Sequence, residues 1–187
     1  VVGFDMSGED ARVPVLEQDD LLIGFLLGRT LSADRDGRAN VIALNGGDFA
    51  PQLKRDRTWE VFKWRYPGIR ELARAGAVTA QVAADTEIEV SGLLAQHPEA
   101  DVVVAFWDEF ARGAVRAITK AGRADRVRVY SVDVTDEDVE MMTAPGSPWV
   151  ATVATDARNI GRVAVRAAVA LLAGERVGRT LLVEPQL

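Results

Sequence analysis

Two side chains that could contact a ligand come directly after short apolar segments. Trp107 follows the run 102–106, and Asp133 ends the run 127–132. In proteins built on parallel sheets, ligands bind at the carboxyl ends of the strands. A carboxylate at that edge can accept hydrogen bonds from ligand hydroxyls, and an indole ring can stack on the flat face of a sugar. Together with Arg57, these residues would supply the polar and apolar contacts of a sugar site.

Other motifs lack the neighbours that their chemistry needs. Gly46-Gly47 is not part of a Gly-x-Gly-x-x-Gly or Gly-Lys-Ser/Thr loop, so no phosphate site is predicted. With no cysteine and a single histidine, thiol catalysis and the usual zinc sites are excluded. The sequence contains no Gly-x-Ser-x-Gly motif, so His97 lacks the nucleophile that a catalytic histidine would activate. The acidic run 133–138 lacks the glycine and distal glutamate of a calcium loop. We therefore expect no enzyme activity, no cofactor and no metal.

Several charged or aromatic residues have structural explanations. Asp136–Asp138 would charge and cap the start of a helix, and His97 would end one. Asp85 comes after the apolar run 77–82, as Asp133 comes after the run 127–132. Most of the acidic residues near Asp85 are explained as charges at the start of a helix. For Trp107, packing in the hydrophobic core stays an open alternative to ligand contact.

Composition sets limits on the partners. The chain has 187 residues, of which 48% are hydrophobic and 27% are charged, which is typical of a globular domain. A net charge of −6 is the wrong sign for a nucleic-acid groove or an anionic membrane surface, so no nucleic-acid partner is expected. The apolar run within 21–27 is far shorter than the roughly 18 residues that span a bilayer, so we expect no direct membrane insertion of this segment.

The elements that must position these residues alternate along the chain. Helical patterns of ten to eighteen residues, for example 108–121 and 156–173, separate most of the apolar runs that read as strands. The central run 102–106 is continuously apolar, as in a strand covered on both faces. We predict an α/β fold with a three-layer, doubly wound parallel sheet. The expected strands are 1–4, 13–16, 40–44, 77–82, 101–106, 127–132, 149–153 and 180–183.

Five stretches in this order are similar to one known family over nearly the whole chain. They are Gln18-Asp19-Asp20 with Gly24, Val41–Gly46 with Arg55-Asp56-Arg57, His97–Ala114, Val129–Asp133, and Val150–Ala154 with Ile160-Gly161. The most specific is His97–Ala114, with its His-Pro-Glu, apolar strand, Asp-Glu and Gly-Ala. The chain resembles the type I periplasmic sugar-binding proteins of ABC importers, close to ribose-binding protein.

The resemblance implies a ligand site between two α/β lobes joined by three crossovers. By position, Asp5 matches the ligand aspartate of the first lobe, Arg57 the ligand arginine and Asp133 the aspartate of the second lobe. Trp107 stands where ribose binders have asparagine, and Thr155 where they have glutamine. Asp85 falls near the position of an aromatic residue of the second lobe. These departures imply a sugar or polyol other than ribose, with stacking moved from position 85 to Trp107.

The resemblance also predicts the domain organisation and the partners. Residues 1–18 would end the N-terminal lobe, 19–155 would form the C-terminal ligand-binding lobe, and 156–187 would return toward the N-terminal lobe. We expect a fragment that lacks most of the N-terminal lobe, from an extracytoplasmic solute-binding protein that serves ABC permease subunits. The alternative is the effector-binding domain of a LacI-type, sugar-responsive transcription regulator. The residues encoded before Val1 would separate these classes through a signal peptide or lipobox, or a helix-turn-helix.

Overall fold

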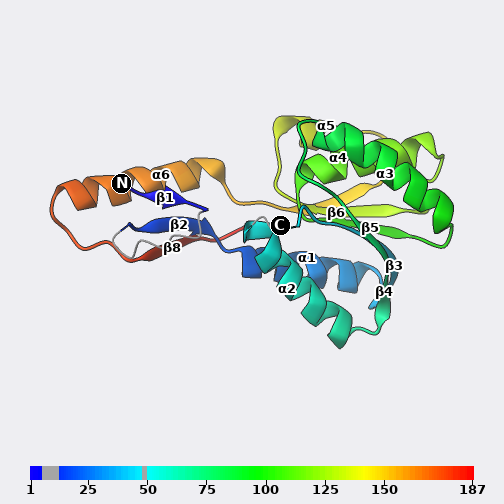
Figure 1. The fold of residues 1–187 in the computed structure, drawn as a ribbon, viewed down its shortest axis with the longest axis horizontal. Coiled ribbons are helices and arrows are strands. Elements are labelled where there is room, and N and C mark those ends of the chain that lie inside the picture. The colour runs from blue at the N-terminus through cyan, green and yellow to red at the C-terminus, as the bar shows by residue number, and fades with distance from the viewer. Residues whose placement is uncertain (6–12, 48–49) are drawn as a thin grey trace.

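The computed structural model describes residues 1–5, 13–47 and 50–187, which form two parallel sheets (Figure 1). The larger sheet has the order β4-β3-β5-β6-β7, with all neighbouring strands parallel. Its strands are β3 (Arg38–Leu44), β4 (Gly68–Ala75), β5 (Val102–Ala105), β6 (Arg128–Val132) and β7 (Trp149–Val153). The smaller sheet joins β1 (Gly3–Phe4), β2 (Val15–Gln18) and β8 (Thr180–Val183).

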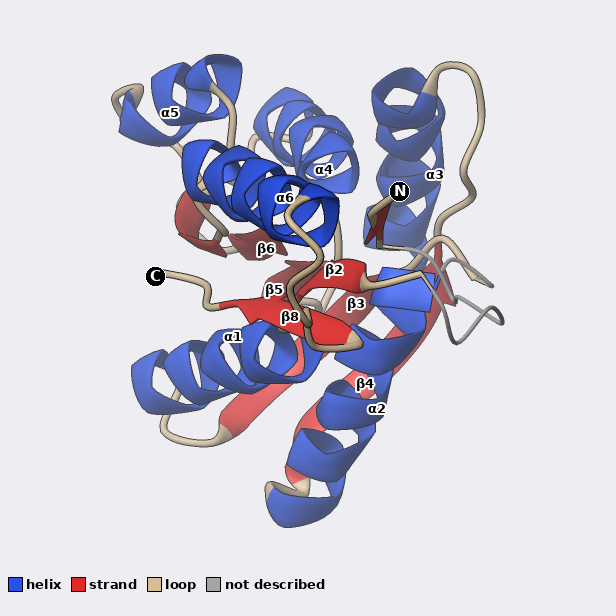
Figure 2. Ribbon diagram, turned by 90° about the vertical axis from the view of Figure 1, so that its left-hand side faces the viewer, coloured by secondary structure: helices blue, strands red, loops and turns tan. Residues whose placement is uncertain are grey.

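Helices cover both faces of the larger sheet, which confirms the predicted three-layer α/β class (Figure 2). One face carries α1 (Asp20–Asp34) and α2 (Ala50–Arg65), and the other carries α3 (Val82–Gln96), α4 (Asp108–Lys120) and α5 (Asp136–Thr143). The remaining helix, α6 (Ala157–Leu172), lies beside the smaller sheet. None of the helices in the described ranges is long and apolar enough to cross a membrane.

The strands are apolar on both faces because each face has its own core. On β5, Val103 packs in the core beneath α3 and α4, whereas Val102 and Val104 pack in the core beneath α1 and α2. This alternation follows the two-residue period of a strand. Since both sets of side chains are buried, the strand reads as one continuous apolar run.

The order of the strands selects the edge where a ligand site can form. The chain winds from β3 outward to β4, then crosses back to β5 and continues to β7. Such a reversal leaves a crevice at the carboxyl ends of the two central strands. Here Leu44 at the end of β3 pairs with Ala105 at the end of β5. The segments that follow these strands therefore start side by side.

One predicted strand is wrong. The run 77–82 forms no strand, and the edge strand β4 lies earlier, at Gly68–Ala75. This strand was not predicted because Arg70, Glu71 and Arg74 interrupt its apolar residues. Glu71 bonds Lys63 and Arg74 at 2.8 Å each, so an ion-pair cluster occupies positions where a central strand would carry apolar residues.

The two sheets are connected at three places close to each other in space. The chain passes from β2 to α1 at Asp19, and from β7 to α6 at residues 154–156. After β8 it returns to the larger sheet, where Gln186 and Ala154 exchange backbone hydrogen bonds of 2.7 and 2.8 Å. Residues 6–12 of the first segment lie outside the described part, and the expected boundaries 18/19 and 155/156 stay a prediction. Assignment of the segments to lobes of a longer molecule stays a prediction.

Candidate functional site

A cavity of about 270 Å³ lies where the smaller sheet meets the carboxyl edge of the larger one. Its lining comes from segments far apart in the sequence: Asp5, Gln18, Pro51, Gln52, Arg55, Val78, Trp107 and Asp133. The strand ends contribute acids, the first turns of α2 contribute an amide and a guanidinium, and Val78 comes from the loop before α3. The cavity therefore has a polar side and an apolar side.

Asp5 and Asp133 occupy equivalent positions at the ends of strands in the two sheets. Their φ angles are 45° and 71°, in the left-handed region that non-glycine residues rarely adopt. Each backbone N–H donates to the next strand, Asp5 to Leu16 and Asp133 to Val153, at 2.9 Å in both cases. The Asp5 carboxylate accepts from the backbone and side-chain nitrogens of Gln18, both at 3.2 Å. Such backbone strain concentrates at ligand sites.

Arg55 is the buried cation of the cavity, with a side chain only 3% exposed. Its Nε donates to Asp20 at 2.8 Å, and its Nη1 donates to the carbonyl of Phe106 at 2.7 Å. Nη1 also lies 3.4 Å from a carboxylate oxygen of Asp133. The guanidinium thus links the start of α1 with the ends of β5 and β6.

Gln52 and Trp107 have fixed orientations beside this cation. Gln52 is buried, and its side-chain oxygen accepts from the backbone N–H of Gly46. A Cβ at Gly46 would lie 2.8 Å from Val78, so the glycine permits this close approach. Trp107 is half-buried and packs edge-to-face on Phe110 with ring centroids 5.8 Å apart. The ring therefore packs on the core and also lines the cavity. Core packing and ligand contact are thus compatible for Trp107.

Burial changes the acidity of this region. Desolvation raises the pKa of Asp133, while Arg55 opposes that change. Desolvation likewise raises the pKa of Asp20 to about 6 despite its bond to Arg55. The pKa of Asp108, next to Trp107, rises to about 7 through burial and through the nearby carboxylates of Asp138 and Asp133. Carboxyls with raised pKa values can donate as well as accept hydrogen bonds near neutral pH.

Three of the six predicted site residues meet in this cavity: Asp5, Trp107 and Asp133. Arg57 does not, because it lies two residues after Arg55 and a helix turns by about 200° over that step. It is exposed and lines a different, apolar groove with Leu21, Phe25 and Val61. The expectation for Arg57 is therefore corrected: the arginine that lines the cavity is Arg55.

Asp85 and Thr155 also lie outside the lining. Asp85 is exposed in the first turn of α3, where it accepts a hydrogen bond from Thr79 at 2.6 Å. Its prediction rested on the family resemblance and on the expected strand 77–82, and Val78 of that segment reaches the cavity instead. Thr155 lies in the crossover after β7, and its buried Oγ1 has no hydrogen-bond partner within the part of the chain that the structure describes.

A signal for Arg55 was present in the sequence. The buried positions of α2 include Pro51, Arg55, Trp59 and Phe62, with spacings of four, four and three. This is the period of one helix face. For a helix that begins at residue 50, this pattern places Arg55 on the buried face and Arg57 on the opposite one.

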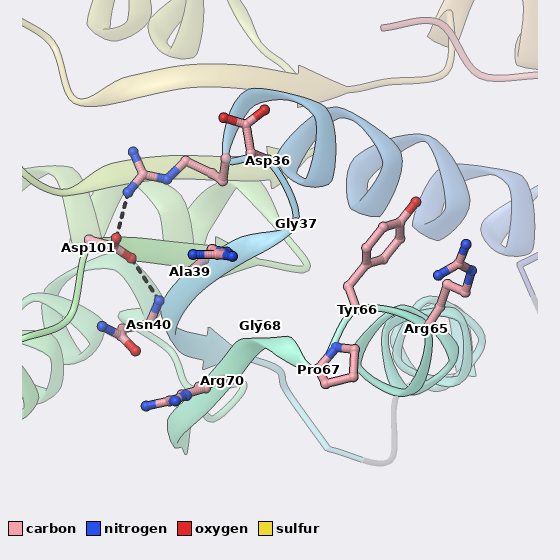
Figure 3. Close-up of a pocket in the computed structure, with 12 residues that line it drawn as sticks. Asp36, Gly37, Ala39, Asn40, Arg65, Tyr66, Pro67, Gly68, Arg70 and Asp101 are labelled. Carbon is pink, nitrogen blue, oxygen red and sulfur yellow. Dashed lines mark hydrogen bonds and ion pairs between the residues drawn. The ribbon is translucent and has the colours of Figure 1, made fainter.

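A larger hollow of about 890 Å³ lies around the opposite, amino-terminal end of β3 (Figure 3). Arginines 35, 38, 65 and 70 contribute to its lining. Asp101 accepts hydrogen bonds there from Arg35 and from the backbone N–H of Asn40, which fixes β3 against the start of β5. None of the predicted site residues lines this hollow.

Comparison with known proteins places the chain in a family. Residues 1–176 match the family described as periplasmic binding protein domain. The 5-methylthioribose transporter solute binding protein of Thermotoga lettingae, solved with 5-methylthioribose, is 56% identical, with a TM-score of 0.95 over 100% of this chain. A sugar ABC transporter protein of Yersinia enterocolitica is 32% identical, with a TM-score of 0.92 over 100% of this chain. The ribose import binding protein RbsB of Bacillus subtilis is 26% identical over 181 residues, 97% of this chain.

The chain spans only part of each relative: 59% of the Thermotoga protein, and 57% of the Yersinia and Bacillus proteins. The matches confirm the resemblance to ribose-binding proteins that the sequence indicated, and they agree with the parallel α/β architecture. The chain therefore belongs to the periplasmic binding protein domain family.

Proposed function

We propose that this chain forms part of the solute-binding component of an ABC sugar importer and that its cavity holds one side of the ligand. The observation that carries the proposal is the convergence of Asp5, Arg55 and Asp133 beside Trp107 in one cavity. Carboxylates and a guanidinium match sugar hydroxyls, and an indole ring matches the apolar face of the sugar. The proposal involves no catalytic step.

The two sides of the cavity support a ligand with one polar and one apolar end. Asp5, Arg55 and Asp133 would bind hydroxyl groups, and Trp107 and Val78 would contact an apolar substituent. A 5-methylthiopentose has this form, since its ring carries hydroxyls and its tail is a thioether. The Thermotoga relative was solved with 5-methylthioribose, which is a ligand of this class. We therefore propose 5-methylthioribose as the ligand.

The whole binding protein would enclose the ligand with further residues. This chain spans 59% of the Thermotoga relative, so about two fifths of that protein has no counterpart here. We propose that the complete protein is extracytoplasmic and delivers its ligand to ABC permease subunits. The three relatives above are described as transport or import proteins, which supports the importer over the regulator.

Isothermal titration calorimetry on the full-length protein tests this function. We expect 5-methylthioribose to bind more tightly than ribose, since ribose lacks the apolar tail. Arg55→Ala and Asp133→Ala should each weaken binding by about 10- to 100-fold, because each removes charged hydrogen bonds to a buried polar ligand.

Arg57→Ala is the matched control. It removes the same side chain two positions along α2, on the opposite side of the helix, and should leave affinity unchanged. Equal losses in both arginine variants, or full affinity in Arg55→Ala, would contradict the assigned site. Binding of ribose with equal affinity would contradict the proposed ligand.

A further inference from the structure

Asp20 is a buried charge that does not cap its own helix. It is the first residue of α1, and its side chain is 1% exposed. The cap of that helix is its neighbour Asp19, whose carboxylate accepts from the backbone N–H of Leu22 at 3.0 Å. The Asp20 carboxylate instead bonds the Nε of Arg55 at 2.8 Å. Removing a carboxylate from water costs free energy, and the ion pair with Arg55 offsets that cost for Asp20.

The bond to Asp20 determines which side of Arg55 faces the cavity. Asp20 holds Nε, and the carbonyl of Phe106 holds Nη1 at 2.7 Å. Within the described ranges, Nη2 makes no hydrogen bond to another residue, and Arg55 lines the cavity. A planar guanidinium anchored at two nitrogens has little rotational freedom. Asp20 itself does not line the cavity, so its influence on a ligand would pass through Arg55.

We propose that Asp20 is a positioning residue for Arg55 and that ligand binding weakens when Asp20 takes up a proton. This inference rests on the proposed function of the cavity. A neutral Asp20 would no longer pair with the guanidinium as an anion, and Arg55 would be held less firmly in the orientation that meets the ligand.

The charges around Asp20 place this change in a mildly acidic range. Burial raises its pKa to about 6, Arg55 and Lys54 of α2 oppose the rise, and Asp5 at the end of β1 adds to it. Across Arg55 lies Asp133, whose pKa is also raised by burial. Well above pH 6 Asp20 is ionised and the pair is intact. At pH 5 about one tenth of the molecules keep the charge. With a neutral Asp20 that binds about tenfold more weakly, affinity should fall about fivefold between pH 7 and pH 5.

Calorimetry of the full-length protein with 5-methylthioribose from pH 5 to pH 7.5 tests the proposal. We expect the fivefold loss in the wild type. Asp20→Asn should bind about tenfold more weakly at pH 7.5 and show little further change at pH 5. Asp19→Asn is the matched control, since it alters the adjacent carboxylate and should keep the wild-type pH profile. A wild-type profile in Asp20→Asn, or its loss only in Asp108→Asn, would overturn the proposal.

A second measurement works without any ligand. In nitrogen-15 NMR spectra of the free protein, the Nε–H signal of Arg55 should shift with a midpoint near pH 6 and should lose that titration in Asp20→Asn. If the wild type fails to bind 5-methylthioribose but the signal titrates, the proposed ligand fails and the role of Asp20 stands. A signal that does not titrate, or that titrates equally in Asp20→Asn, overturns the role of Asp20.

Discussion

At the scale of single residues, the buried charges of this protein occur with specific partners. Arg112 of α4 donates from Nε to Asp138 at 2.6 Å and from Nη2 to the Thr135 hydroxyl at 2.8 Å. Burial acts to raise the pKa of Asp138, but hydrogen bonds from Arg112 and Thr135 outweigh it and lower that pKa. The cluster fixes α5 against the helix that begins beside Trp107.

Asp138→Ala should therefore lower the unfolding free energy by about 3 to 5 kcal/mol, because it leaves Arg112 buried without its main partner. Urea unfolding measures this loss. Glu109→Ala is the control, since Glu109 also bonds Arg112 at 2.8 Å but has a side chain 33% exposed. It should cost no more than about 1 kcal/mol. Similar losses in both variants would contradict the difference that burial makes.

At the scale of elements, α3 and α4 approach each other closely at Gly113. A Cβ at this position would lie 2.4 Å from the carbonyl oxygen of Ala83 and 2.6 Å from the Cβ of Thr86. These contacts involve the backbone of α3 and the base of a side chain, neither of which can turn away. The glycine thus sets the distance between two helices on the face of the sheet that also carries Asp108.

Gly113→Ala should lower the unfolding free energy by about 1 to 3 kcal/mol, because the added methyl group forces α3 and α4 apart. Thermal unfolding monitored by circular dichroism measures the effect. Gly92→Ala in α3 provides the opposite case, because nothing lies within 4 Å of the added Cβ. It should raise stability by about 0.5 to 1 kcal/mol through the better helix propensity of alanine. A neutral Gly113→Ala would contradict the close approach of the two helices.

At the scale of the whole molecule, acids with opposite pKa shifts determine how stability depends on pH. Burial raises the pKa of Asp20 to about 6 and that of Asp108 to about 7. For Glu71, burial acts upward, but hydrogen bonds from Arg74, Lys63 and Trp59 lower its pKa to about 2. The folded state therefore binds more protons than the unfolded chain at Asp20 and Asp108, and fewer at Glu71.

Stability should accordingly be highest at mildly acidic pH. As pH rises from 5.5 to 7.5, Asp20 and Asp108 ionise in the folded state, and the unfolding free energy should fall by about 1 to 3 kcal/mol. As pH falls below 4.5 toward 2, Glu71 takes up a proton and its contribution to the unfolding free energy is lost. Urea unfolding at pH 3, 5.5 and 7.5, followed by the fluorescence of the buried Trp59 and Trp149, measures both limbs.

Asp108→Asn provides the control for the upper limb, because it removes one of the two titrating acids and should flatten the slope between pH 5.5 and 7.5. Stability that is equal or higher at pH 7.5 in the wild type would contradict the raised pKa values. The same measurement separates loss of ligand affinity at pH 5 from unfolding, since the folded state should be close to its most stable there.

The sequence by itself determined the layered α/β architecture and the place of Trp107 and Asp133 at the carboxyl edge of the larger sheet. Strand and helix periods are local, and parallel strands bring their carboxyl ends to one edge whatever the details of packing. Trp107 and Asp133 follow strands of the larger sheet, so their meeting could be predicted from the strand pattern. Asp5 ends a strand of the smaller sheet, and its place was expected only from the family resemblance. The edge strand β4 could not be predicted, because its alternation is hidden by Arg70, Glu71 and Arg74, and the last two bond each other instead of packing in the core.

Only the tertiary structure decided which arginine lines the cavity and what holds it. Arg55 and Arg57 have the same chemistry and lie two residues apart, but the start of α2 and its packing on the sheet turn one inward and the other outward. The pairing of Arg55 with Asp20 joins residues 35 positions apart. Contacts of that kind depend on the position of one helix against another, and no local pattern in the sequence specifies it.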